Sequence, residues 1–150
     1  MTIRRAELRD AANISRFIQQ LTEEFIVKDC TKEGTETLLR TMKTEIIKSQ
    51  ILAGDAHYLA EVDDRLVGVI GLKSSKHLVH LYVDKTHQNR GIARSLWEKL
   101  VALQNHQVCS ITVNSSLNAI GFYQKMGFIA ESTGQVKNGI PSIPMKITIN

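Results

Sequence analysis

The run Gln88-Asn89-Arg90-Gly91-Ile92-Ala93 contains residue types that can bind a bulky anion. This run follows an apolar stretch and opens a helical pattern, and the first amides of a helix have no partners within the helix. The helix dipole adds partial positive charge at that end, while Arg90 and Arg94 add full charges. Gly91 and Ala93 leave room for a ligand to approach the backbone. The run fits a diphosphate, although an ordinary strand-turn-helix junction with a convenient glycine has the same pattern.

The elements that must position this run belong to one mixed domain covering residues 1–150. The spacing of apolar residues predicts the order β-α-α-β-β-β-α-β-α-β-β. This order indicates a mixed α/β (α+β) domain with one central sheet of about seven strands and about four helices. The predicted strands are 2–7, 57–62, 66–72, 78–83, 108–113, 128–132 and 143–149, and the predicted helices are 10–21, 35–52, 91–105 and 116–126.

Composition restricts the class of protein further. The chain has 150 residues, of which 43% are hydrophobic and 23% charged, as in an ordinary globular domain. Its net charge of +4 is scattered, without the basic stripe and interleaved aromatic residues of nucleic-acid binding. No apolar run approaches the ~18 residues that cross a membrane, and no signal peptide is visible. Cys30 and Cys109 lack zinc-ligand spacing, so we expect no metal and a cytoplasmic protein.

Two motifs in the second half of the chain resemble the GNAT acetyltransferase superfamily. Residues 88–93 are similar to its Q/R-x-x-G-x-G/A motif, and Leu81-Tyr82-Val83-Asp84 is similar to its fourth strand. The stretch 114–128 is similar to its region that ends in F-Y-x-K-x-G-F, from which Gly121 departs as a glycine inside a helix. The resemblance implies a GNAT-like, mostly antiparallel sheet with splayed middle strands. It also implies an N-acetyltransferase with acetyl-CoA as cosubstrate.

The resemblance also implies which residues would bind acetyl-CoA. The pantetheine arm would lie between the fourth and fifth strands and pair with backbone groups of the fourth. The diphosphate would lie on the amides of residues 88–93. Asn114 would contact the arm or cap a helix, and Asn118 would face the arm or simply be exposed. The implied residues are Leu81, Val83, Gln88, Asn89, Arg90, Gly91, Ile92, Ala93, Arg94, Ser95, Asn114 and Asn118.

Tyr123 is the implied general acid. When an amine attacks the thioester, a thiolate must leave, and a thiol has an ordinary pKa of ~8.5. A proton donor beside the sulfur therefore eases its departure. The alternative for Tyr123 is a packed aromatic residue whose hydroxyl has a structural partner. Phe122, its neighbour, is expected to point the other way, into the core.

The residue that deprotonates the amine is less clearly marked. An alkyl amine has a pKa of ~10.4 and arrives protonated at neutral pH. By resemblance, His77 occupies the position of the base, and its ordinary pKa of ~6.5 suits that role. Strand alternation places His77 on one face with Leu81. It places the competing His80 on the other face with Leu78 and Tyr82, unless a bulge interrupts the strand. A chain of water molecules is a further alternative.

The acceptor is implied to be a primary amine of a small molecule or peptide. By resemblance, its pocket would be built from residues 21–35 and 135–144. Three acidic residues of the first segment would attract a cationic amine or simply face solvent: Glu23, Glu24 and Asp29. A protein N-terminal or lysine acetyltransferase and a catalytically silent CoA-binding regulatory module remain as alternatives. No nucleic-acid or membrane partner is expected, and a homodimer is possible.

Overall fold

The computed structural model describes residues 1–104 and 110–149, which form eight β-strands and five α-helices. The strands are β1 (Thr2–Arg5), β2 (Ala56–Val62), β3 (Arg65–Lys73), β4 (His77–Val83), β5 (Ser110–Ser115), β6 (Ile129–Ala130), β7 (Gln135–Lys137) and β8 (Ile140–Thr148). The helices are α1 (Ala11–Phe25), α2 (Lys32–Arg40), α3 (Thr44–Leu52), α4 (Ile92–Ala102) and α5 (Ile120–Met126). Three short 3-10 helices are η1 (Leu8–Asp10), η2 (Val27–Asp29) and η3 (Lys85–His87).

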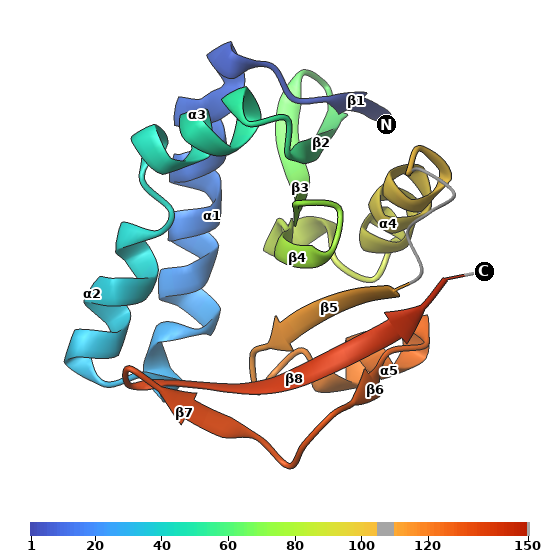
Figure 1. The fold of residues 1–150 in the computed structure, drawn as a ribbon. Coiled ribbons are helices and arrows are strands. Elements are labelled where there is room, and N and C mark those ends of the chain that lie inside the picture. The colour runs from blue at the N-terminus through green and yellow to red at the C-terminus, as the bar shows by residue number, and fades with distance from the viewer. Residues whose placement is uncertain (105–109, 150) are drawn as a thin grey trace.

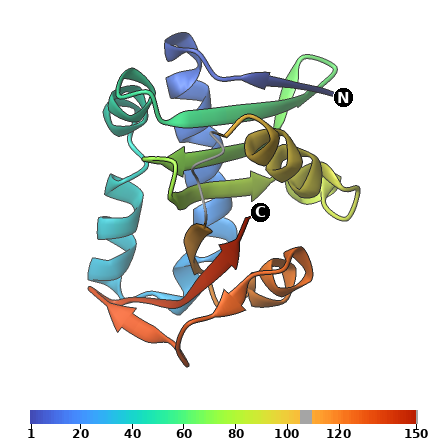
Figure 2. The same cartoon turned by 45° about the vertical axis from the view of Figure 1, so that its right-hand side comes forward.

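The strands form one sheet in the order β1-β2-β3-β4-β5-β8-β6, and β7 pairs with β8. Neighbouring strands are antiparallel except for β4 and β5, which are parallel. Helices α1 and α3 cover one face of β1–β4, and α4 covers the other (Figures 1 and 2). The predicted class, a mixed α/β domain with a mostly antiparallel sheet, is confirmed.

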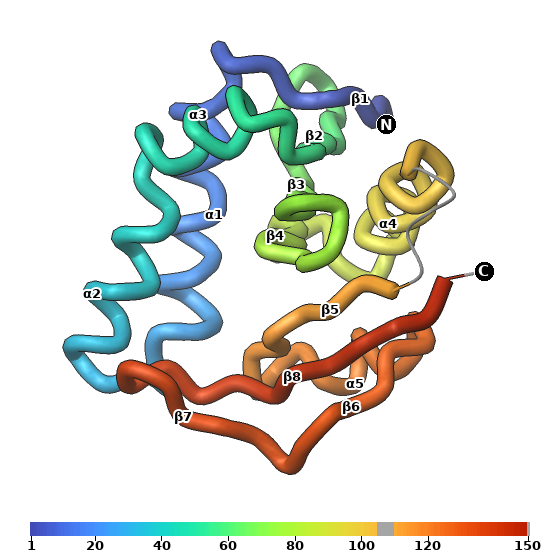
Figure 3. The backbone as a smooth tube through the Cα atoms, in the orientation of Figure 1, coloured from blue at the N-terminus to red at the C-terminus, as the bar shows by residue number. Residues whose placement is uncertain are grey.

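The sheet opens between β4 and β5. These strands pair only at His77 with Thr112 and at Leu78 with Val113. Beyond these pairs, Leu81 and Val83 remain paired with β3 alone. The chain path therefore shows two parts, β1–β4 and β5–β8, that are joined side by side through this short parallel pair (Figure 3).

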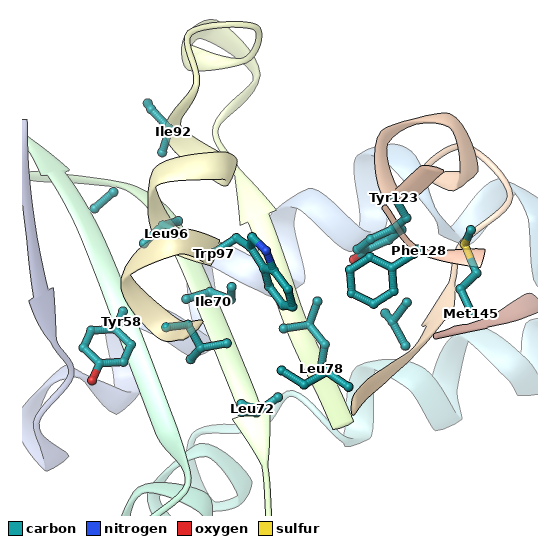
Figure 4. Packing of buried hydrophobic residues seen from close by; sticks show 14 of the residues in the cluster. Tyr58, Ile70, Leu72, Leu78, Ile92, Leu96, Trp97, Tyr123, Phe128 and Met145 are labelled. Carbon is teal, nitrogen blue, oxygen red and sulfur yellow. The ribbon is translucent and has the colours of Figure 1, made fainter. Parts of the chain in front are cut away.

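An aromatic cluster joins the two parts on the α4 side of the sheet. Trp97 of α4 lies 5.4 Å from Phe128 between ring centroids, and Phe128 lies 5.3 Å from Tyr123 of α5 (Figure 4). Leu78, at the joint of the sheet, belongs to the same buried cluster. Because close-packed rings deform little, this core holds α4 and α5 at a fixed separation.

Two local structures differ from the sequence-based prediction. The helix predicted over 35–52 is divided into α2 and α3, because Met42 turns inward and its carbonyl accepts a hydrogen bond of 2.6 Å from the Ser15 hydroxyl. The hairpin of β7 and β8 was not predicted. Its two-residue turn, Asn138-Gly139, has φ angles of 53° and 77°, as the tightest hairpin turns require. The predicted boundaries at 105 and 108, and Cys109, lie outside the described residues.

A bulge in β4 corrects the predicted alternation. His80 pairs with Gly71, but Leu78 pairs with Leu72, so β4 carries one extra residue between them. Leu78 consequently joins the core beside α4, whereas His80 lies against Tyr82 on the α1 side. The bulge thus places Leu78 and His80 on opposite faces.

Two buried histidines lie side by side under α3. The rings of His57 and His80 are 5.6 Å apart, and Gly71 lies between them, where an added Cβ would come within 2.8 Å of the His57 ring. His57 Nδ1 donates to the Asp55 carbonyl, and His80 Nε2 donates to Gln50. Their other ring nitrogens have no partner among the described residues. Burial lowers the pKa of both histidines, that of His80 to about 3.

Acidification should therefore destabilise the fold from pH ~6.5 downward. Below pH ~6.5 the unfolded chain protonates His80 while the folded chain keeps it neutral, so His80 alone removes about 2–3 kcal/mol of unfolding free energy by pH ~4.5. Denaturant unfolding between these pH values measures this loss. His80→Gln should flatten the dependence. Equal pH dependence in wild type and His80→Gln would contradict this interpretation.

Candidate active site

A cleft of about 610 Å³ lies beside the opening between β4 and β5. Its walls come from the end of α1, the second half of β4, the segment 87–94, and the segment 116–126 that follows β5. Strand β4 contributes Leu81, Tyr82 and Val83 to the lining. The cleft is thus bounded by the same segments in which the sequence motifs occur.

The first turn of α4 opens into this cleft. Gly91 caps the helix with a left-handed φ of 79°, and no side chain caps the first amides. A Cβ at Gly91 would meet no atom within 4 Å, so the space above it is open. Gln88 donates from Nε2 to the Val83 carbonyl at 3.0 Å, which ties the loop to β4. Uncapped amides that face an open space form an anion-binding geometry.

The charges around the cleft favour an anion as well. Arg94 and Lys125 line it, and no described lining residue is a carboxylate. Asp84, at the start of the loop, accepts hydrogen bonds from the Thr86 hydroxyl at 2.6 Å and from His87 Nδ1 at 2.9 Å. These bonds lower the pKa of the Asp84 carboxyl, and its negative charge is hydrogen-bonded within its own loop.

Tyr123 lines the cleft although it is only 7% exposed. Burial raises the pKa of its hydroxyl, and the neighbouring Tyr82 raises it further. Tyr82 also lines the cleft, and its hydroxyl is hydrogen-bonded to Thr22 at 3.2 Å. A raised pKa keeps Tyr123 protonated at neutral pH, so its hydroxyl is able to donate a proton.

Phe122 does not point into the core as expected. It is 37% exposed and lines the cleft, while Tyr123 and Phe128 fill the core beside it. The reason is that α5 buries only one side, and the ring of Tyr123 occupies that side. Phe122 packs edge-on against Tyr123, with 5.3 Å between ring centroids.

The structure brings most of the predicted site residues to this cleft. Those in its lining are Leu81, Val83, Gln88, Asn89, Gly91, Ile92, Ala93, Arg94, Asn118 and Tyr123. Those outside its lining are Arg90, Ser95, Asn114 and His77. Asn114 is exposed on β5 and pairs with Pro144 of β8. Asn118 accepts a hydrogen bond of 2.6 Å from the Ser116 hydroxyl, which shapes the loop before α5.

His77 lies outside the cleft lining, where β4 and β5 pair with each other. Its Nδ1 is hydrogen-bonded to the Thr112 hydroxyl at 2.8 Å. Burial, and then the charge of Lys73, lower the pKa of His77. The competing His80 is buried under α3 and is likewise outside the lining. The role of His77 as base stays a prediction.

Several lining residues after β5 were not predicted as site residues: Ser116, Ala119, Phe122, Lys125 and Met126. Leu21, Phe25 and Ile26 also line the cleft, and they belong to the segment 21–35 that was expected on the acceptor side. The apolar ones carry the same pattern as core residues, so their spacing alone predicts burial and not a ligand. In the described residues, no group of three His, Cys, Asp or Glu residues is arranged to hold a metal. None of the described helices is long and apolar enough to cross a membrane.

Comparison with known proteins places this geometry in one family. Residues 26–149 match the family described as Acetyltransferase (GNAT) domain. N-acetyltransferase 8B from Homo sapiens is 31% identical over 125 residues, which cover 74% of this chain and 54% of that protein. The chain thus spans about half the length of this curated relative.

Solved structures agree on the fold. A GCN5-related N-acetyltransferase from Rhodopseudomonas palustris has a TM-score of 0.79 at 22% identity, covering 99% of this chain and 95% of the other. The PaiA N-acetyltransferase from Thermoplasma acidophilum, solved in complex with coenzyme A, has a TM-score of 0.81 at 19% identity and covers 99% and 98%. The family match covers most of the chain, and the opened sheet and the glycine-capped helix agree with it. The chain therefore belongs to the GNAT acetyltransferase family.

Proposed function

We propose that the protein transfers the acetyl group of acetyl-CoA to a primary amine of a small molecule or peptide, by direct attack in a ternary complex. The observation that supports this most is the cleft beside the opening between β4 and β5, which pair at only two positions, with the uncapped amides of α4 in its wall. A diphosphate suits those amides, and an extended amide-bearing arm suits unpaired strand edges.

The described residues fit acetyl-CoA as cosubstrate. The diphosphate would be held by backbone amides from Gln88 to Ala93, with the guanidinium of Arg94 beside them. The free edge of β4 at Leu81 and Val83 offers backbone groups to the pantetheine arm, since β3 occupies only the other edge. The relative solved with coenzyme A has the same fold, which supports this assignment.

Tyr123 would protonate the leaving sulfur. The amine nitrogen forms a bond to the thioester carbon, the carbon–sulfur bond breaks, and the hydroxyl proton of Tyr123 passes to the thiolate. Burial raises the pKa of Tyr123, so its hydroxyl stays protonated and can donate a hydrogen bond to the sulfur as negative charge develops there. Among the described lining residues the one histidine is His87, which is hydrogen-bonded to Asp84. The proton of the amine would therefore leave through water or through a base such as His77.

Acetyl-CoA should stabilise the folded chain and support turnover of an amine. A ligand present at about 100 times its Kd stabilises the folded state by about 2.7 kcal/mol, which appears as a higher Tm. Adenosine, which lacks the diphosphate and the arm, is the control and should leave Tm nearly unchanged. A screen of amines, with release of free thiol as readout, then tests transfer and identifies the acceptor.

The results of this screen separate the alternatives. Turnover of free amines supports a small-molecule enzyme, and turnover of peptides alone favours an N-terminal or lysine acetyltransferase. Stabilisation by acetyl-CoA without turnover of any amine would favour a silent CoA-binding module. Absence of stabilisation would contradict the whole proposal. The homodimer and the cytoplasmic location stay predictions.

A further inference from the structure

The cleft has an apolar lining at the end of α1 that is separate from the hydrophobic core. Leu21, Phe25 and Ile26 line the cleft there. The described residues form two buried hydrophobic clusters, one around α4 and one against α1 and α3, and neither cluster includes these three residues. Phe122 of α5, which is 37% exposed, adds a second phenylalanine ring from another wall of the cleft. We call these four residues the apolar lining.

The spacing of apolar residues along α1 explains how they reach the cleft. Ile14 and Ile18 are fully buried in the cluster against the sheet, and Leu21 and Phe25 continue the same helical stripe at intervals of three and four. Phe25, in the last turn of α1, is only half-buried. Apolar surface that remains open to water is stabilised when an apolar group covers it. The end of the stripe is therefore suited to an apolar part of a ligand.

The three acidic residues that could attract a cationic amine lie outside the cleft lining. Glu23 lines a separate hollow beside Thr44, at the start of α3. Glu24 forms an ion pair with Lys85, with 3.4 Å between Oε1 and Nζ. Asp29 is exposed at the end of η2. The segment 21–35 thus contributes apolar side chains to the cleft, and its described carboxylates point to no cation there.

The charges of the lining disfavour an acceptor with a second positive charge. Arg94 and Lys125 are cationic, and none of the described lining residues is a carboxylate. A second ammonium or guanidinium group on the acceptor would lose water against the apolar lining without gaining a counter-ion. The reacting amine itself must give up its proton, so it needs no such counter-ion when it attacks.

We infer that the acceptor carries its amine on an apolar body, aromatic by preference, without a second positive charge. The inference rests on the proposed function and names the substrate class of the same site. The diphosphate and the arm are assigned to residues 88–94 and to the edge of β4, which leaves the apolar lining to the body of the acceptor. The rings of Phe25 and Phe122 favour an aromatic group, because aromatic pairs are stabilised beyond the apolar area that they bury.

Three probe amines test this inference at saturating acetyl-CoA. Phenethylamine carries a phenyl ring, butylamine carries an alkyl chain, and agmatine is butylamine extended by a guanidinium group. We expect kcat/KM for phenethylamine to be about tenfold above that for butylamine, and kcat/KM for agmatine to be about a hundredfold below it. If only peptides are acetylated, the same order is expected for peptides that begin with phenylalanine, alanine and arginine. Equal values, or a preference for the cationic probe, would overturn the inference.

Phe25→Glu supplies the carboxylate that the described lining lacks. It should lower kcat/KM for phenethylamine about tenfold and raise kcat/KM for agmatine about tenfold, with the KM for acetyl-CoA unchanged within about twofold. Leu52→Glu is the matched control, since it adds the same charge at a side chain that is 73% exposed and outside the lining. Leu52→Glu should leave the order of the three amines as in the wild type.

Phe25→Ala keeps the test open if Phe25→Glu does not fold. It removes the ring without adding charge, so it should abolish the preference for phenethylamine over butylamine and leave kcat/KM for agmatine nearly unchanged. A higher KM for acetyl-CoA in Phe25→Ala, with the order of the amines unaltered, would assign the ring to the cosubstrate and overturn the inference. A wild-type chain that acetylates neither free amines nor peptides would instead overturn the proposed function.

Discussion

Gly91→Glu is expected to weaken acetyl-CoA binding about a hundredfold or more, equivalent to about 2.7 kcal/mol. Gly91 has a left-handed φ of 79°, and its missing side chain opens the space above the uncapped amides of α4. A glutamate fills that space and brings a negative charge to the position where the diphosphate must lie. Steric exclusion and charge repulsion therefore act together.

Gly91→Asn separates these effects from strain. Asparagine tolerates a left-handed φ better than other non-glycine residues and carries no charge. The affinity of Gly91→Asn for acetyl-CoA should lie between that of the wild type and that of Gly91→Glu. Calorimetric titration measures the affinities, and a thermal melt without ligand confirms that each variant folds. If Gly91→Glu bound acetyl-CoA as tightly as wild type, the diphosphate site would have to lie elsewhere.

Tyr123→Phe is expected to lower kcat about a hundredfold or more, as loss of a general acid typically does. The affinity for acetyl-CoA should change little, because phenylalanine retains the edge-on packing against Phe128. Because burial raises the pKa of Tyr123, the wild-type hydroxyl remains protonated in mildly alkaline solution, and the difference between the two proteins should persist there.

Tyr82→Phe provides the matched control for this experiment. Tyr82 is the other tyrosine in the described lining, and its hydroxyl already has a partner in Thr22. Its removal should reduce kcat far less than removal of the Tyr123 hydroxyl. Equal kcat values for wild type and Tyr123→Phe at several pH values would exclude the acid role and leave Tyr123 as a packing residue.

Local signals explain what could be predicted from the sequence. The glycine-capped start of α4 was predictable because the strand end, the glycine and the helix start follow one another closely in the chain, at Val83, Gly91 and Ile92. The division between α2 and α3 was not, since it depends on the contact of Met42 with Ser15 of another helix. Strand β7 was missed because its residues are all exposed and show no apolar alternation, although Asn138-Gly139 is a typical hairpin turn.

The remaining site residues depend on tertiary contacts. The bulge at the centre of β4 changes which side chains share a face, and no local pattern in Leu78–Leu81 fixes its position. His77 matches a family position, but it lies where β4 and β5 are paired with each other. Only the pairing of β4 with β5 in the folded chain shows this. Phe122 was expected in the core, yet it lines the cleft because Tyr123 occupies the buried side of α5.

A crystal structure with bound acetyl-CoA would show whether the first turn of α4 and the opening beside β4 hold the cosubstrate. We expect the diphosphate to contact the amides around Gly91, the arm to lie along the free edge of β4, and the sulfur to lie near the Tyr123 hydroxyl. A ligand bound away from the first turn of α4, or an arm that leaves the gap between the two middle strands empty, would contradict this expectation.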